Sequence, residues 1–127
     1  MTVLDTSVLI DFERRDAQAL DLVDELLAAG ELAVSSVTVH EVLRSPALTP
    51  AWRSYWEDFF DVVVILDLDR PAAEAGAALW LEQRARNLKP EVGDVLIAGA
   101  AAAAGFEAVT ADEGFAELAG ARLLRAC

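Results

Sequence analysis

The sequence predicts an α/β fold with a mostly parallel central sheet flanked by helices. Short apolar runs recur along the chain, and each is followed by a segment with the apolar spacing of a helix, an alternation typical of parallel sheets. The 127 residues are close to the commonest domain size, contain no linker-like segment and are 55% apolar. We therefore treat residues 1–127 as one domain.

Five short apolar runs are expected to form the strands of this sheet, and seven segments with helical spacing follow or separate them. The predicted strands are Thr2–Leu4, Leu32–Ser35, Val62–Leu68, Ala108–Thr110 and Ala121–Leu124. The predicted helices are Ser7–Arg15, Ala17–Ala29, Val37–Arg44, Ala51–Phe60, Pro71 to about Arg86, Asp94–Ala104 and Glu113–Leu118. Their ends follow from local signals: Gly30 and Gly105 stop helices, Pro50 occupies a first helical position, and Asp69 is a plausible cap.

Net charge argues against a simple phosphate-binding surface. The chain carries 22 acidic and 10 basic residues, a formal charge of −12. Carboxylates gathered around a cation would contribute to this excess, and the cation would reverse the local sign. The remaining acids are explained by solvated helix faces. A basic binding partner is a second interpretation of the acidic excess.

Cysteine usage and hydropathy indicate the compartment. The single cysteine, Cys127, excludes an intramolecular disulfide and fits a reducing environment. The first residues do not have the pattern of a signal peptide, and the small-apolar run Val95–Ala104 is too short to span a bilayer. We expect a cytoplasmic protein without a membrane partner.

Four acids occur where they could meet at one edge of the sheet. Asp5 and Asp112 follow predicted strands, Glu41 lies in the helix after the second strand, and Asp94 opens a helix after Gly93. Ligands of open parallel sheets bind beyond the carboxyl ends of the strands. The positions of these four acids therefore predict an acidic crevice there.

Helix capping is the alternative explanation for these acids. Asp94 and Asp112 each stand where a helix is expected to begin, and Thr38 to Glu41 matches a capping box. Asp5 resists this interpretation best, because a carboxylate that closes an apolar strand gains little unless something binds it.

Clustered carboxylates repel one another unless a counter-charge is present. Mg²⁺ or Mn²⁺ would relieve the repulsion, since these ions prefer oxygen ligands, and such an ion can activate water for phosphodiester hydrolysis. With His40 as the one histidine, a catalytic histidine pair and a multi-histidine zinc site are both excluded. We expect His40 to be structural.

Four motifs in this order resemble those of PIN domains, and their spacing is similar to that of the toxins of VapC-type toxin–antitoxin pairs. They are Leu4–Asp11, Ser36–Val42, Gly93–Ala98 and Val109–Phe115. The resemblance implies a Mg²⁺- or Mn²⁺-dependent endoribonuclease, homodimerisation and a cognate antitoxin. It also implies the acids Asp5, Glu41, Asp94 and Asp112, with supporting hydroxyls at Thr6 or Ser7 and at Thr110.

Several features keep other interpretations open. Six cations could line an RNA groove, although each could equally be solvated surface: Arg14, Arg15, Arg44, Arg84, Arg86 and Lys89.

Four aromatic residues could form a partner surface, although core packing explains them better: Trp52, Tyr55, Trp56 and Phe59. A catalytically silent PIN-like module that binds a protein partner is the main alternative. Receiver domains and haloacid-dehalogenase-like phosphatases fit poorly, because Thr6 and Ser7 stand where those families need a second acid.

Overall fold

The computed structural model describes residues 1–124; Cys127, on which the disulfide argument rests, lies outside the described residues. The elements alternate between strands and helices as expected. In chain order they are β1 (Thr2–Leu4), α1 (Thr6–Glu13), α2 (Ala17–Ala29), β2 (Leu32–Ser35), α3 (Ser36–Leu43), α4 (Pro50–Val62), β3 (Val64–Leu66), α5 (Arg70–Ala85), α6 (Val92–Ala104), β4 (Glu107–Thr110), α7 (Glu113–Ala119) and β5 (Arg122–Leu123).

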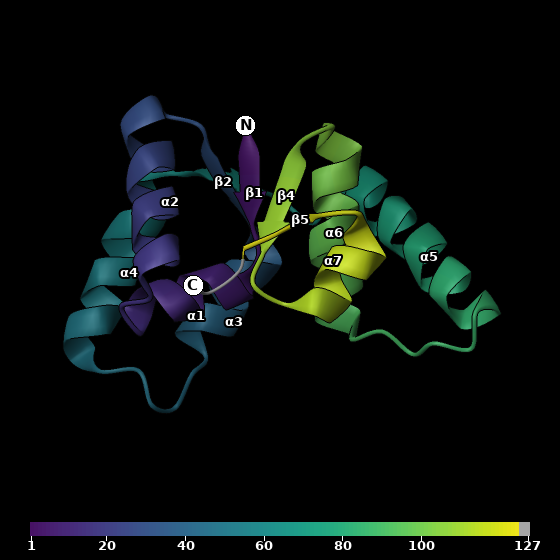
Figure 1. Cartoon of the computed structure of the whole chain (residues 1–127), viewed down its shortest axis with the longest axis horizontal. Coiled ribbons are helices and arrows are strands. Elements are labelled where there is room, and N and C mark those ends of the chain that lie inside the picture. Colours follow the sequence, from purple (N-terminus) through teal and green to yellow (C-terminus); the bar gives the residue numbers. More distant parts are fainter. Residues whose placement is uncertain (125–127) are drawn as a thin grey trace.

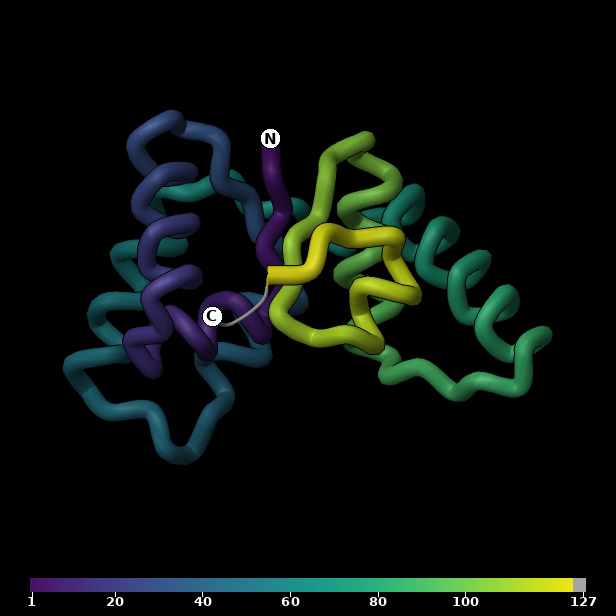
Figure 2. Tube along the Cα trace, viewed as in Figure 1, coloured from purple at the N-terminus to yellow at the C-terminus, as the bar shows by residue number. Residues whose placement is uncertain are grey.

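The five strands form one sheet in the order β3-β2-β1-β4-β5, and every neighbouring pair is parallel. The first strand is therefore central, with Val3 opposite Ala33 on one side and Ala108 on the other. Figures 1 and 2 show this strand running beside β4, which comes from near the other end of the chain. The prediction of a mostly parallel sheet flanked by helices is confirmed.

The two faces of the sheet bury different helices, because successive side chains of a strand point to opposite faces. Val3, Ala33 and Ala108 pack with the residues of α6 and α7. Leu4 and Val34 point the other way, into a core built with α1, α2 and α4. Figure 1 shows these two groups of helices on either side of the strands. The carboxyl ends of β1 and β4 therefore open between two helical layers.

Small residues bring α5 and α6 into close contact. A Cβ atom added at Gly99 would lie 2.5 Å from the carbonyl oxygen of Ala72 and 2.5 Å from the backbone nitrogen of Gly76. No side chain fits at that distance, so a glycine is required at this crossing. The contact holds α6, and with it Asp94, in a fixed position against α5.

The aromatic residues of α4 are mostly core. Trp56 and Phe59 are 1% and 4% exposed, and Trp56 packs against both Phe12 of α1 and Phe59, which confirms the core interpretation for these two. Trp52 is half-buried, whereas Tyr55 keeps 39% of its surface exposed. The indole N–H of Trp56 donates to Glu13 at 2.8 Å, so its one polar atom is satisfied.

Most elements differ from their expected bounds by one or two residues, and three of the differences bear on the site or the core. β3 is shorter than Val62–Leu68, because α4 continues through Val62 before the chain turns. α3 begins at Ser36, capped by the Ser35 hydroxyl, and α6 begins at Val92, two residues before Asp94. None of the helices within residues 1–124 combines the length and the hydropathy that a membrane crossing requires.

Candidate functional site

Asp5 lies at the carboxyl end of the central strand and is 4% exposed. Its Oδ1 accepts hydrogen bonds from the Ser7 hydroxyl at 2.6 Å and from the backbone N–H of Val8 at 3.4 Å. Its Oδ2 accepts a hydrogen bond from the Thr110 hydroxyl at 2.6 Å. Asp5 is the N-cap of α1 as well, so the expectation that capping does not explain it was wrong. The same buried carboxylate joins β1, α1 and β4.

The hydroxyl contacts continue from Asp5 to Asp112. The Thr110 hydroxyl accepts a hydrogen bond from the backbone N–H of Asp112 at 2.9 Å. The Ser7 hydroxyl accepts one from the backbone N–H of Ala111, also at 2.9 Å. Asp112 itself caps α7, since its Oδ2 accepts the N–H of Phe115 at 2.8 Å. The cap leaves the carboxylate exposed at the helix start, so capping and a second role are compatible in Asp112.

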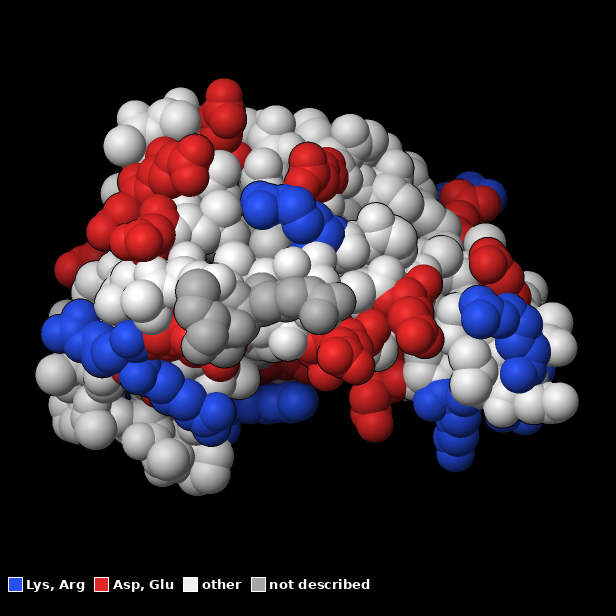
Figure 3. All heavy atoms as spheres, in the orientation of Figure 1, with Lys and Arg blue, Asp and Glu red and all other residues white. Residues whose placement is uncertain are grey.

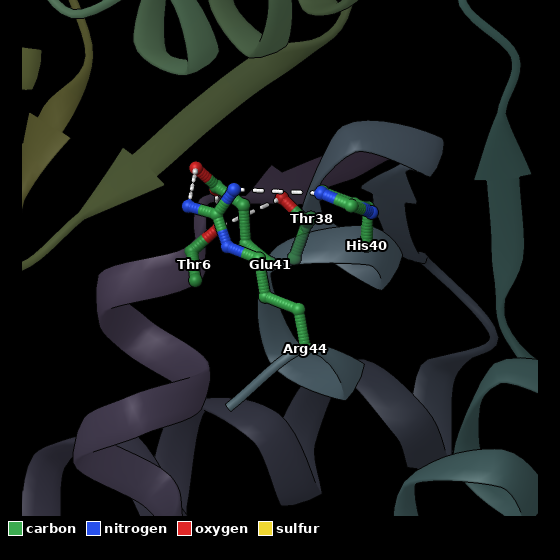
Figure 4. Close-up of polar contacts among 5 residues, drawn as sticks. All are labelled: Thr6, Thr38, His40, Glu41 and Arg44. Atoms are coloured by element: carbon green, nitrogen blue, oxygen red, sulfur yellow. Dashed lines mark hydrogen bonds and ion pairs between the residues drawn. The ribbon is translucent and has the colours of Figure 1, made fainter. Parts of the chain in front are cut away.

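Glu41 does not form the capping box that its spacing suggested. Ser35 caps α3, and Glu41 lies beyond the first turn, where its Oε1 accepts the Thr6 hydroxyl at 2.5 Å. Figure 4 shows Thr6 and Glu41 facing each other from α1 and α3, with Arg44 folded back over the carboxylate. The Arg44 guanidinium stands 3.8 Å from Glu41 Oε2 and 3.4 Å from His40 Nε2. His40 is exposed and contacts Arg44, not the carboxylate of Glu41.

Gly93 brings Glu41 to the start of α6. A Cβ atom at Gly93 would stand 2.7 Å from Glu41 Oε2, so the missing side chain provides the space that this carboxylate occupies. The sequence gives no sign of this contact between Gly93 and Glu41. Asp94 follows directly, at the third helical position, and Glu91 rather than Asp94 precedes the helix as N-cap. The capping explanation of Asp94 is therefore wrong.

The four acids influence one another electrostatically around Asp94. Burial, followed by the charges of Asp5, Asp112, Glu41 and Glu91, raises the pKa of Asp94 to about 6. Burial also raises the pKa of Asp5, while hydrogen bonds from its hydroxyl partners oppose the rise. The acids, up to about a hundred residues apart in the sequence, thus lie within electrostatic range of Asp94.

The donor chemistry of this cluster fits a hard divalent cation. All four side chains offer carboxylate oxygens, and a raised pKa at Asp94 indicates a position short of positive charge. The side chains do not form a ready-made shell, however: among residues 1–124, no three acid, histidine or cysteine side chains converge closely enough to hold one metal ion. The Asp5 carboxylate instead accepts hydrogen bonds from two hydroxyls. The Glu41 carboxylate accepts a hydrogen bond from Thr6 and pairs with Arg44.

Three of the predicted cations lie beside the acids. Arg44 pairs with Glu41, Arg14 lines a hollow of about 340 Å³ together with Glu41, and Lys89 lines a cavity of about 270 Å³ together with Asp94. Arg84 instead lies over the ring of Trp80, 5.8 Å from its centroid. For Arg15 and Arg86, no ion pair with these acids occurs within the described part of the chain.

Comparisons with known proteins agree with this architecture. The chain is similar to a chain of VapBC from Salmonella typhimurium bound to DNA, with 21% identity, a TM-score of 0.79 and coverage of 99% of this chain and 98% of that one. A chain of VapBC2 from Rickettsia felis, bound to a promoter DNA fragment, matches at 19% identity with a TM-score of 0.79, over 97% and 96% of the two chains.

A higher identity, 30%, is found with VapBC-5 from Mycobacterium tuberculosis, a member of the VapBC family of toxin–antitoxin systems, with a TM-score of 0.68 over 95% and 92% of the chains. A comparison with curated protein sequences gave no match. The PIN domain model matches residues 2–121, nearly the whole chain. The resemblance noted from the four motifs is thereby confirmed, and the chain belongs to the PIN domain family.

Proposed function

We propose that the protein is a Mg²⁺- or Mn²⁺-dependent endoribonuclease that acts in the cytoplasm as the toxin of a type II toxin–antitoxin system. The observation that carries this proposal is the placement of four acids within electrostatic range of one another in a PIN domain, where burial and the charges of the other three raise the pKa of Asp94. An acid cluster of this kind supports hydrolysis of phosphodiesters better than any chemistry based on His40, which points to Arg44.

Asp5, Glu41, Asp94 and Asp112 would hold the cation. When bound, the ion supplies an activated water and stabilises charge on the phosphoryl oxygens. The hydroxyls of Thr6, Ser7 and Thr110 fix the orientation of the carboxylates, as the hydrogen-bond partners of metal ligands commonly do. Asp94 has no such partner among the described residues, so it is the acid that is free to turn toward a ligand.

RNA is the proposed substrate. The strongly acidic chain needs local positive charge to bind a polyanion, and Arg14, Arg44 and Lys89 provide it beside the acids. Figure 3 shows acidic side chains gathered between the two halves of the molecule, with basic side chains on either side of them along the lower edge of the view. A strand of RNA could thus be bound at its flanks while the acids face the scissile phosphate.

An antitoxin and a second copy of the chain are the proposed protein partners. Similar chains occur in VapBC assemblies and in a toxin–antitoxin complex from Klebsiella pneumoniae, which supports an antitoxin partner. Exposed apolar residues on α5, the following loop and α6 offer a surface for a homodimer: Trp80, Leu81, Leu88 and Val92. Sedimentation of the purified chain measures the dimer directly.

Cleavage of RNA by the purified chain tests the proposed function. We expect single-stranded or structured RNA to be cleaved with Mn²⁺ or Mg²⁺, and cleavage to stop with a chelator. Asp5→Asn and Asp94→Asn should each lower the rate of cleavage by more than about 100-fold. Loss of a mere hydrogen-bond partner of a metal ligand already lowers metal affinity or activity by about 10- to 100-fold. Gel analysis of labelled RNA measures the rates.

Asp58→Asn is the matched control, because Asp58 is an exposed acid of α4 away from the strand ends. It should cleave as the wild type does. Retained activity in both Asp5→Asn and Asp94→Asn contradicts the assignment of the site. A wild-type chain that binds a partner but never cleaves RNA supports the silent PIN-like binding module instead.

A further inference from the structure

The cavity beside Asp94 contains a polar side chain that the proposed chemistry does not use. Gln83 of α5 is 6% exposed and lines this cavity of about 270 Å³. From these observations we propose that the cavity binds one nucleobase of the RNA strand, with Gln83 binding the edge of the base and Glu91 and Glu117 selecting bases that carry an exocyclic amino group. The inference rests on the proposed ribonuclease function, and it adds base-binding residues to it.

Gln83 has no hydrogen-bond partner for its side-chain amide among residues 1–124. Although the residue as a whole is buried, neither polar atom of its amide is fully enclosed, so the amide faces the cavity and is available to water or to a ligand there. A ligand that displaces water from the amide has to replace its hydrogen bonds, because a buried amide left unpaired is costly. Since an amide offers both a donor and an acceptor, it can bind the edge of a base that offers both.

The walls of the cavity suit a base better than a phosphate. Leu88, Pro90 and Leu118 provide apolar surface for the faces of a flat heterocycle. Glu91 and Glu117 line the same cavity and would repel a phosphate, whereas they can accept hydrogen bonds from an exocyclic amino group. Adenine, cytosine and guanine carry such a group and uracil does not, so uracil should bind least well.

An arginine side chain from a protein partner fits these groups less well. A guanidinium has only donors, so the donor half of the Gln83 amide would stay unpaired. The carboxylates of the lining attract a guanidinium as well as an amino-bearing base, so charge alone does not separate the two ligands. The unpaired donor half of Gln83 is what favours a base over an arginine side chain.

The position of the cavity relates base binding to cleavage. Asp94 is part of the cavity lining, so a base bound there holds its own backbone next to the acid cluster. Proteins that recognise single-stranded RNA by sequence commonly place splayed bases in such pockets. The cavity would thus determine which nucleotide lies beside the scissile bond.

Binding of free nucleosides to the metal-free chain tests the cavity without any cleavage. Nuclear magnetic resonance titration should show adenosine, cytidine and guanosine shifting the side-chain amide signals of Gln83 and the methyl signals of Leu88 and Leu118 in the millimolar range. Uridine should bind more weakly. Gln83→Met keeps the length of the side chain and removes its hydrogen bonds, and should weaken binding of the three amino-bearing nucleosides about 3- to 10-fold.

Gln18→Met is the matched control, because Gln18, in α2, is the other glutamine of the chain and lines none of the cavity. It should bind nucleosides as the wild type does. Equal binding of all four nucleosides with no loss in Gln83→Met overturns the proposal, and so does the absence of shifts at the cavity. Binding of free arginine there in place of nucleosides also overturns it, in favour of a peptide partner.

Cleavage of oligonucleotides that differ at a single base separates this proposal from the proposed function. The wild type should prefer cleavage beside an amino-bearing base, and Gln83→Met should cleave beside such a base more slowly, because the base is held less firmly in the cavity. RNA cleavage with no effect of Gln83→Met on base preference or nucleoside binding overturns the cavity proposal and leaves the nuclease intact. Nucleoside binding that depends on Gln83, in a chain that cleaves no RNA, supports the cavity and contradicts the nuclease.

Discussion

Asp5 and Asp94 belong to the same acid cluster, but their surroundings differ. Asp5 is almost fully buried at the end of β1 and accepts hydrogen bonds from two hydroxyls and one backbone N–H. Asp94 is half-buried in the first turn of α6 with none of these contacts, and its pKa is raised to about 6. One carboxylate is fixed in place by its neighbours, whereas the other is held mainly by the backbone of its helix.

The cluster therefore has a rigid part, Asp5 with its hydroxyl partners, and a responsive part, Asp94. Hydrogen bonds to the charged form of Asp5 offset part of the cost of its burial. Asp94 has no such compensation, so it is the acid whose energy should change most when a proton or a cation arrives. Three experiments test this difference, from the largest expected effect to the smallest.

Added Mn²⁺ should stabilise the folded protein through Asp94. A ligand at about 100 times its dissociation constant raises the free energy of unfolding by about 2.7 kcal/mol if it binds only the folded state. We expect a rise of this order in the wild type, measured by urea unfolding, and almost none in Asp94→Asn. An equal rise in both proteins would contradict the role given to Asp94.

Loss of the Thr110 hydroxyl should destabilise the rigid part of the cluster. Thr110→Val keeps the shape of the side chain but removes the donor to Asp5 and the acceptor of the Asp112 N–H. Because both partners stay buried or part-buried, the free energy of unfolding should fall by about 2 kcal/mol. Thr2→Val, on the same sheet and without such a bond, is the control and should change it by less than about 0.5 kcal/mol. A small effect of Thr110→Val would show that Asp5 does not depend on this hydroxyl.

The pH dependence of stability should reveal the raised pKa of Asp94. A pKa of about 6 in the folded protein, against 3.8 for an ordinary aspartate, means that the folded state binds the proton more tightly. The resulting stability is complete below about pH 4 and is lost as the pH rises through 6. In the presence of a chelator, Asp94→Asn should therefore be more stable than the wild type at pH 8, by about 1 kcal/mol after solvent screening of a half-buried group, and nearly equal at pH 4. A constant difference between the two proteins would contradict the raised pKa.

Much of the fold could be predicted because its signals are local. β1, β2 and α2 have the predicted bounds, since short apolar runs or a cap and a terminal glycine mark their ends. The end of α4 could not be predicted in this way. Val62 is apolar and β-branched and suits a strand, yet it continues the helix, because the preceding turns of α4 are packed on the core through Trp56 and Phe59.

The places of the four acids in the fold could be predicted, but their contacts could not. Predicted strand ends placed Asp5 and Asp112, and predicted helix positions placed Glu41 and Asp94. Arg44 pairing with Glu41 depends on how α3 ends, and the space that Gly93 leaves for Glu41 depends on how α3 and α6 meet. Gln83 left no signal at all, because a glutamine in a polar helical pattern resembles solvated surface until the structure shows it buried.

The strand order has a consequence for the timing of assembly. β1 is synthesised about a hundred residues before β4, one of its two neighbours in the sheet. The carboxylate of Asp5 therefore lacks its Thr110 partner until β4 has been made, and Asp112 follows Thr110. A nascent chain cannot assemble the four acids before Asp112 has been synthesised.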